Sequence, residues 1–148
     1  MLAGSRIRFL SRDECFGLLR TTGVGRVAVN RDGVPHVVPV NYRVFEESVV
    51  FRCGTGIKLS AAVLGRPMSF EVDRIDEATA SGWSVLVTGS AHVVRDEETV
   101  AAVDALDLRC FDPSGKHAIV QLDALLVSGR EIRPASPSDD VVGVRRRC

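Results

Sequence analysis

Phe51-Arg-Cys-Gly-Thr-Gly-Ile-Lys-Leu-Ser60 joins an apolar run to a glycine-rich break and the start of a helix-forming segment. The apolar run at residues 49–53 favours a β-strand, and Gly54-Thr-Gly56 interrupts it. Residues 58–64 are good helix formers, and Gly65 then supplies an ordinary stop signal. The sequence therefore predicts a strand, a turn and a short helix that carries one lysine in its first turn.

This strand-turn-helix is a candidate phosphate site. The first amides of a helix point outward without partners, and Lys58 adds a formal positive charge beside them. Thr55 or Ser60 can add a hydroxyl, and Arg52 can add a second cation if its side chain faces the same way. Because a glycine break after a strand is also an ordinary turn, the spacing alone leaves both interpretations open.

Short alternating segments on both sides of this stretch predict a mainly β protein with short helices. Ser11-Arg-Asp-Glu14 matches a capping box and predicts a helix over residues 12–21. From Val24 the apolar period becomes two, and Arg31-Asp-Gly33 predicts the turn of a hairpin that ends near Asn41. Further strands are expected at residues 49–53, 68–72, 83–94 (interrupted by a bulge at Gly89), 118–127 and 131–133, and a further helix at 96–108. Six or seven short antiparallel strands with two or three helices are typical of a small closed or nearly closed barrel.

Composition excludes several classes of protein. A chain of 148 residues, 45% hydrophobic, can bury one core, so we expect one domain over residues 1–134 and a mobile tail over 135–148. Nineteen basic and nineteen acidic residues give no net charge, which argues against nucleic acid or an anionic membrane as a partner. The sequence has no apolar run of membrane-spanning length and no signal-peptide pattern, so a cytoplasmic protein is expected.

The other reactive residue types form no catalytic pattern. The four cysteines are widely spaced, without the Cys or His pairs of zinc sites, so no metal is expected. The three histidines are dispersed over different segments, and no Ser-His-Asp arrangement can be defined. Trp83 begins a predicted strand, where its indole is either a core or interface anchor or a ring that stacks on a cofactor.

Five ordered blocks between about Leu10 and Val94 resemble one known family. The blocks are Gly25-Arg-Val-Ala-Val, Pro35-His-Val-Val-Pro-Val-Asn-Tyr42, Val49-Val-Phe-Arg-Cys-Gly-Thr-Gly-Ile-Lys-Leu-Ser60, Met68-Ser-Phe-Glu-Val-Asp73 and Gly82-Trp-Ser-Val-Leu-Val-Thr-Gly89. In this order they resemble the pyridoxamine 5'-phosphate oxidase-like, FMN-binding split-barrel proteins, including the nitroimidazole-reductase-like and deazaflavin-binding relatives.

The resemblance implies a six-stranded antiparallel split β-barrel that forms a homodimer with two flavin sites at the subunit interface. The cofactor ring would lie along residues 39–42 and 51–53, and the phosphate would meet Lys58 with help from Thr55 and Arg52. Trp83 and Ser84 would lie near the ring or the phosphate, from the same or the partner subunit. The implied cofactor-binding residues are Pro39, Val40, Asn41, Tyr42, Phe51, Arg52, Cys53, Thr55, Ile57, Lys58, Leu59, Trp83 and Ser84.

The resemblance also implies a function, with alternatives left open. The main interpretation is an FMN-binding oxidoreductase that transfers hydride or electrons between a small-molecule donor and a small unknown acceptor, with chemistry supplied by the flavin. One alternative is a reductase that uses the deazaflavin coenzyme F-420, whose polyglutamate tail would need extra positive charge from Arg6, Arg8 or residues 145–147. Another is a carrier or sensor that binds flavin without turnover. Oxidation of pyridoxamine phosphate is not expected, because the sequence has no second phosphate cradle and no matching C-terminal Arg/His motif.

Overall fold

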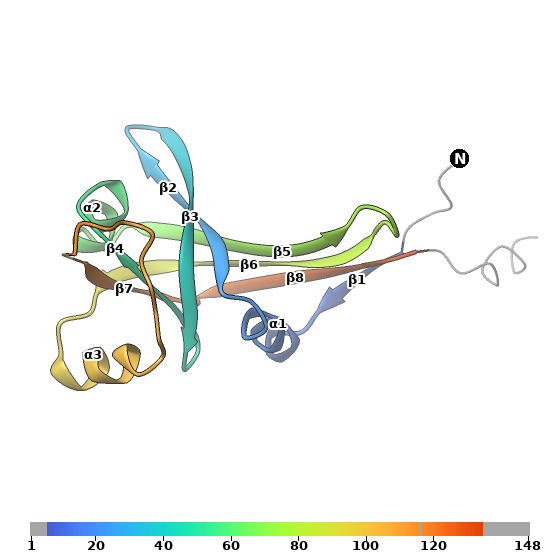
Figure 1. The fold of residues 1–148 in the computed structure, drawn as a ribbon. Helices are drawn as coiled ribbons and strands as arrows, with labels where there is room; N and C mark the ends of the chain where they lie inside the picture. Colours follow the sequence, from blue (N-terminus) through green and yellow to red (C-terminus); the bar gives the residue numbers. More distant parts are fainter. Residues whose placement is uncertain (1–5, 116, 135–148) are drawn as a thin grey trace, which may run out of the picture.

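The fold is mainly β, with eight strands and three short helices in the part of the chain that is described (Figure 1). A computed structural model describes residues 6–115 and 117–134. The elements in chain order are β1 (Arg6–Leu10), α1 (Arg12–Leu19), β2 (Val24–Arg31), β3 (Val34–Phe45), β4 (Ser48–Cys53), α2 (Ile57–Val63), β5 (Pro67–Asp76), β6 (Ser81–Val93), α3 (Glu97–Asp104), β7 (Ala118–Asp123) and β8 (Leu126–Arg133). The strands are paired in the order β1-β8-β6-β5-β2-β3-β4-β7, and a further pairing of β6 with β7 closes six of them into a ring.

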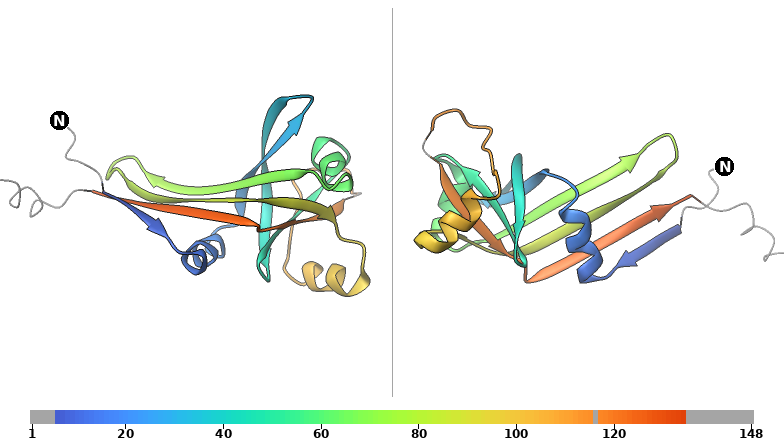
Figure 2. Two further views of the ribbon diagram at one scale, coloured as in Figure 1. Left: turned by 180° about the vertical axis from the view of Figure 1, so that it is seen from behind. Right: turned by 60° about the horizontal axis from the view of Figure 1, so that its bottom comes forward.

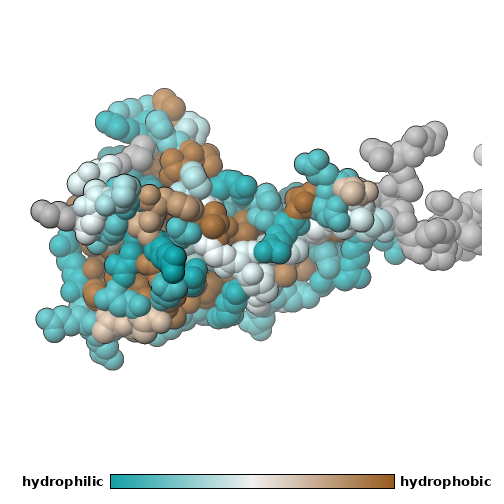
Figure 3. Space-filling view, in the orientation of Figure 1, coloured by the Kyte–Doolittle hydropathy of each residue, from teal (hydrophilic) through white to brown (hydrophobic). Residues whose placement is uncertain are grey.

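The six strands β6, β5, β2, β3, β4 and β7 form an antiparallel barrel, and β8 and β1 extend the sheet beyond it. This arrangement confirms the split barrel that the sequence predicts. In Figures 1 and 2, β5, β6 and β8 run out of the barrel as a long arm, and β1 lies along its edge. Figure 3 shows apolar side chains over the barrel end of the molecule, whereas the arm is mostly hydrophilic on this face.

β6 belongs to both the barrel and the arm because it changes partner along its length. From Gly82 to Thr88 it pairs with β8, and from Ala91 to Val93 it pairs with β7. Its pairing with β5 runs through Gly89 in one continuous register, so the predicted interruption at that residue is wrong. A Cβ at Gly89 would lie 1.7 Å from the backbone oxygen of Asp123, so glycine is needed where the β7–β8 connection crosses the strand.

The barrel core is built from alternating side chains of the strands. Its largest fully buried members include Tyr42, Phe51 and Phe70. The Tyr42 and Phe70 rings meet edge to face, with centroids 4.7 Å apart. Val50 belongs to a second, smaller cluster that α3 covers. Where a strand buries one face, that burial sets its register, because a one-residue slip would expose the whole face.

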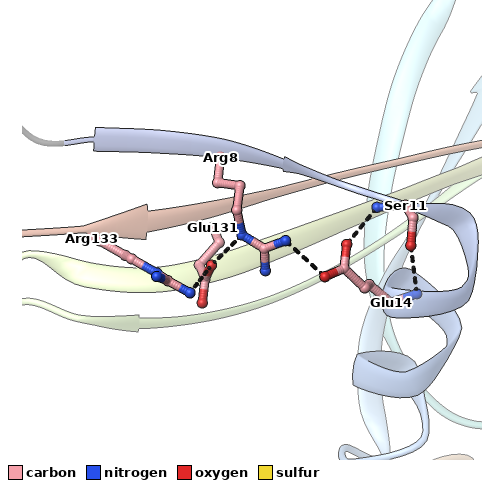
Figure 4. A network of polar contacts seen from close by, with 5 residues as sticks. All are labelled: Arg8, Ser11, Glu14, Glu131 and Arg133. Carbon is pink, nitrogen blue, oxygen red and sulfur yellow. Dashed lines mark hydrogen bonds and ion pairs between the residues drawn. The ribbon is translucent and has the colours of Figure 1, made fainter.

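α1 begins where the sequence predicts. Ser11 caps the helix through its hydroxyl, which accepts a hydrogen bond from the Glu14 amide at 3.2 Å, and the Glu14 carboxylate accepts one from the Ser11 amide at 2.8 Å. The same Glu14 accepts from Arg8, and Glu131 accepts from Arg8 and pairs with Arg133 (Figure 4). This chain of charges ties α1 to β1 and β8 at the edge of the arm.

Several predicted boundaries differ from the structure. β1 was not predicted, and the predicted strand at residues 118–127 is two strands with a turn between Asp123 and Leu126. The helix predicted at 96–108 ends at Asp104, and the strand predicted at 68–72 extends to Asp76. The predicted tail at 135–148 lies outside the described residues. The structure therefore does not test the predicted domain limits. Among the helices of the described residues, none is long and apolar enough to cross a membrane.

Candidate functional site

A cavity of about 420 Å³ opens at the junction of β3, β4 and α2, and we call it the Lys58 cavity. The connection between α3 and β7 forms its remaining wall. The lining residues are Val38, Pro39, Val40, Asn41, Arg52, Gly54, Thr55, Gly56, Lys58, Cys110, Phe111 and Asp112. The cavity therefore contains the glycine-rich break that the sequence singles out as a phosphate site.

Lys58 is the cation of this cavity that forms no ion pair with a described carboxylate. It lies in the first turn of α2 and is half-buried, and no carboxylate among the described residues is within ion-pair distance of it. Thr55 lines the same cavity and is exposed. The Ser60 hydroxyl, by contrast, donates to the Gly56 carbonyl at 3.0 Å, so it is already occupied. Lys58 and Thr55 can thus meet an anion together.

Arg52 lines the cavity but its guanidinium points to α3. Its Nε donates to the Leu108 carbonyl at 2.9 Å, and its terminal nitrogen pairs closely with the Asp104 carboxylate. The charge of Arg52 is therefore compensated within the fold. The sequence predicts a second cation for the phosphate here, and the structure instead gives Arg52 a role in fixing the α3 end of the cavity wall.

Asp112 contributes a negative charge close to the glycine-rich break. Hydrogen bonds from the Ser114 amide and hydroxyl, both 2.9 Å long, lower the pKa of this carboxyl, so it is ionised at neutral pH. A Cβ at Gly54 would lie 2.2 Å from an Asp112 carboxylate oxygen, which explains a glycine at this position. The Asp112 carboxylate therefore lies beside the glycine-rich break, and its charge interacts with that of Lys58.

The rest of the cavity surface is largely apolar. Pro39 and Phe111 are exposed at its mouth, and Phe111 has 60% of its surface accessible. Val38 and Val40 of β3 also line it. An apolar slot that ends at a lysine suits a flat ring system joined to a phosphate.

Three residues that the sequence places at the ring lie inside the core. Alternation along β3 and β4 turns the side chains of Tyr42, Phe51 and Cys53 inward, where all three are buried. The Tyr42 hydroxyl donates to the Leu19 carbonyl at 2.6 Å and pairs closely with Thr22. Burial raises the pKa of Cys53 to about 11, so this group is a neutral thiol at pH 7. Only the backbone of these residues can face a ligand.

The other predicted residues are divided between two places. Ile57 begins α2, and Leu59 of the same helix packs against the barrel core. Trp83 and Ser84 lie in the arm, near the start of β6. Trp83 lines a separate cavity of about 310 Å³, the Trp83 cavity, which is formed by Arg8, Leu10, Glu14, Gly17, Leu18, Trp83 and Glu131. Within one chain, Trp83 and Lys58 therefore do not share a cavity.

The structure adds four residues that sequence reasoning missed, Val38 of β3 and three residues between α3 and β7. Cys110, Phe111 and Asp112 reach the cavity from the connection between α3 and β7, and the Cys110 thiol donates to the Arg52 carbonyl at 3.4 Å. The only local signal was the turn-forming composition after Phe111, which does not reveal what the turn covers. Arg8, one predicted source of charge for a deazaflavin tail, is paired with Glu14 and Glu131, and residues 145–147 lie outside the described part of the chain.

Metal or histidine chemistry has no support in the described residues. No group of three or more His, Cys, Asp or Glu side chains in residues 6–115 and 117–134 is arranged to hold a metal ion. His92 approaches Asp123 at 3.6 Å, and the buried Nε2 atom of His117 makes no hydrogen bond. These two histidines line neither the Lys58 cavity nor the Trp83 cavity.

Comparison with known proteins agrees with this architecture. The uncharacterized protein Rv0080 of Mycobacterium tuberculosis is 34% identical over 128 residues, which cover 83% of this chain and 84% of that protein. The structure of an FAD binding protein from Mycobacterium smegmatis has a TM-score of 0.75 and 33% identity, covering 86% of this chain and 100% of that one. A conserved protein of unknown function from Corynebacterium diphtheriae has a TM-score of 0.70 and 34% identity, covering 84% and 97%. Residues 11–131 match the family described as pyridoxamine 5'-phosphate oxidase, and the chain therefore belongs to this family of split-barrel proteins.

Proposed function

We propose that this protein binds a flavin in the Lys58 cavity and uses it to transfer hydride or electrons to a small acceptor. The observation that carries the proposal is a half-buried lysine without a carboxylate partner among the described residues, at one end of an apolar slot. The similarity to a mycobacterial protein named as FAD-binding supports the same cofactor class.

The residues of the cavity match the two ends of a flavin. Lys58 and Thr55 offer a charge-assisted contact and a hydroxyl to a phosphate. Val38, Pro39 and Phe111 offer apolar surface to a ring. The backbone along Pro39 and Asn41 adds polar groups that can hydrogen-bond the ring edges. The phosphate end and the ring end thus lie on different walls of one cavity.

A bound flavin would supply the redox chemistry, and the protein would bind and orient it. Cys53 is a protonated thiol, and Tyr42 has its hydroxyl bonded inside the core, so neither offers a nucleophile or a base to the cavity. Asp112 is held on Ser114. This set of residues fits a binding site whose chain contributes position and charge, with the acceptor admitted over the exposed ring.

We also propose that a second copy of the chain completes the site. Trp83 lies seven residues along β6 from Ser90, which pairs with Pro67 just after α2, and this span is roughly 23 Å of strand. The Trp83 indole lines its own cavity in the arm and not the Lys58 cavity, so the proposal is that it stacks on the flavin from the partner subunit. Exposed apolar residues on the arm, including Phe9 and Leu86, supply surface for such a homodimer.

The test is a flavin titration of Lys58→Ala against Arg95→Ala. Arg95 is an exposed cation that lines neither cavity, so its removal matches the change in charge. Losing one charge-assisted phosphate contact costs about 1.5–3 kcal/mol, which is roughly a 10- to 150-fold weaker Kd. We expect this loss in Lys58→Ala, with Arg95→Ala unchanged, and we expect flavin absorbance to sediment with a dimer.

Each measurement has an outcome that would contradict the proposal it tests. A colourless protein that binds neither FMN, FAD nor F-420 would overturn the flavin proposal, and preference for F-420 alone would identify a deazaflavin protein. A flavin-loaded monomer would overturn the dimer. Reduction of the bound flavin by nicotinamide donors, followed through turnover with small acceptors, separates an oxidoreductase from a carrier.

A further inference from the structure

The Trp83 cavity has the features of a small-molecule site that is separate from the Lys58 cavity. Four elements of one chain contribute to it, because its lining residues belong to β1, α1, β6 and β8. Its volume of about 310 Å³ lies at the lower end of the range of ligand sites, which is about 300–1,000 Å³. The cavity is therefore of a size for a single-ring molecule.

The walls of the Trp83 cavity are apolar and leave room between them. Trp83, Leu10 and Leu18 line it, and all three side chains are half-buried, so part of each surface is accessible. Gly17 of α1 lines it as well, and a Cβ built at this glycine meets no atom within 4 Å. An indole beside two leucines, with free space at a glycine, favours a flat apolar ring.

The rim of the cavity carries two polar atoms with unused hydrogen-bonding capacity. Arg8 donates from Nε to Glu131 at 2.8 Å and from Nη1 to Glu14 at 2.7 Å, whereas its Nη2 has no partner among the described residues (Figure 4). Glu131 uses Oε2 for both Arg8 and Arg133, and its Oε1 accepts no hydrogen bond within residues 6–115 and 117–134. The rim thus offers one donor nitrogen and one acceptor oxygen on neighbouring side chains.

The charges around the cavity favour a neutral ligand. Hydrogen bonds from Arg8 lower the pKa of the Glu14 and Glu131 carboxyls, so both are ionised at neutral pH. An anionic ligand would meet two carboxylates in the lining. A cationic ligand would find those carboxylates already paired with Arg8 and Arg133. A neutral molecule with its own donor and acceptor matches the unused atoms without disturbing the ion pairs.

We propose that the Trp83 cavity binds a neutral planar ring that carries an N–H group beside a carbonyl, as an aromatic carboxamide or a lactam does. The ring packs against the Trp83 indole, the carbonyl accepts from Arg8, and the N–H group donates to Glu131. In the homodimer proposed above the cavity would open beside the partner's flavin, so its ligand would be the small acceptor. That role rests on the proposed function, whereas the binding itself does not.

The experiment follows Trp83 fluorescence in the flavin-free protein, since this residue is the only tryptophan of the chain. The probes are benzamide, acetophenone and benzoate, which share one ring and differ in the group attached to it. Benzamide should change the emission in a saturable way, with a Kd on the order of 1 mM. Acetophenone lacks the N–H group and benzoate is an anion, so each should bind about tenfold more weakly. Calorimetry on the same samples checks the three affinities.

Two pairs of variants place the probe in the cavity. Gly17→Leu adds a side chain where the cavity has free space and should abolish benzamide binding, whereas Gly17→Ala should retain it. Glu131→Gln should weaken benzamide about five- to tenfold and leave acetophenone unchanged. Arg133→Gln removes the same ion pair from outside the lining, so both probes should bind to it as they do to the wild type.

The outcomes separate this inference from the flavin proposal. Absence of benzamide binding, or equal affinity for benzamide and benzoate, would overturn the assignment and leave the flavin proposal standing. Unchanged benzamide affinity in Gly17→Leu would overturn it too, because the probe would then lie elsewhere. If benzamide binds as expected and no flavin does, the site is supported and the proposed function is wrong.

Discussion

The two ends of the molecule use charged residues in opposite ways. In the arm, Arg8, Glu14, Glu131 and Arg133 form one connected set of ion pairs between α1, β1 and β8 (Figure 4). At the barrel end, Lys58 lies beside the glycine-rich turn with no described carboxylate within ion-pair distance, although the Asp112 carboxylate lies close to Gly54.

This difference separates structural charges from charges available to a ligand. Exposed ion pairs contribute little to stability, but they satisfy each other and leave no site for an anion. A lysine next to an apolar slot gains a strong partner only when an anion binds. Position in the fold therefore decides the role of each cation. The net charge of zero indicates neither role.

The boundary between the two ends lies at Gly89, where the largest effect on stability is expected. In Gly89→Ala the new methyl would lie 1.7 Å from the Asp123 carbonyl oxygen, so β6 or the β7–β8 connection must move. We expect a loss of about 3 kcal/mol or more in the free energy of unfolding, measured by urea denaturation. Gly17→Ala in α1 is the matched control, because its Cβ meets nothing within 4 Å and alanine favours a helix by about 0.5–1 kcal/mol. Equal stabilities of the two variants would contradict this role of Gly89.

A second substitution, at Tyr42, tests whether a side chain of the barrel end belongs to the core or to the ligand site. Tyr42→Phe removes only a hydroxyl, which donates to Leu19 and pairs with Thr22. Leaving the buried Leu19 carbonyl unsatisfied should cost about 1–3 kcal/mol of unfolding free energy. Flavin affinity and the flavin absorbance spectrum should stay as in the wild type, because the side chain faces away from the Lys58 cavity. A shifted spectrum with unchanged stability would place the hydroxyl at the ligand.

The sequence predicts the barrel well because most strands bury one face. The alternation in β2 has a physical cause in that burial, and it is visible without the structure, whereas β3 buries only Val40 and Tyr42. β1 escapes prediction because it has no buried face, with four of its five residues exposed along the edge beside β8. The turn between β7 and β8 also escapes prediction. Leu125 and Leu126 continue the apolar run of β7 in the sequence, although both side chains are exposed in the structure.

The residues of the candidate site are likewise only partly predictable from the sequence. Lys58 and Thr55 are found from local spacing, because a glycine break and the helix after it are consecutive in the chain. Asp112 and Phe111 reach the cavity from more than fifty residues away, and no local pattern encodes that approach. The ion pair of Arg52 also depends on α3. The sequence alone therefore predicts an available charge, whereas in the fold Asp104 compensates it.

The smallest predicted effect concerns the charge network of the arm and its dependence on pH. The hydrogen bond from Arg8 lowers the pKa of both Glu14 and Glu131 below the ordinary value of 4.5, with further lowering from the Ser11 amide and from Arg133 respectively. A carboxyl with a lowered pKa in the folded state stabilises the fold above its ordinary pKa, and this stabilisation is lost as pH falls through the folded value. Arg8→Gln should therefore lower Tm slightly at pH 7, and the difference from the wild type should shrink as pH falls from 5 towards 3. Thermal unfolding at pH 7, 5 and 3 measures this, at low salt because screening weakens exposed pairs. A difference that stays constant or widens in acid would show that Arg8 stabilises the arm by packing along β8, without a contribution from its ion pairs.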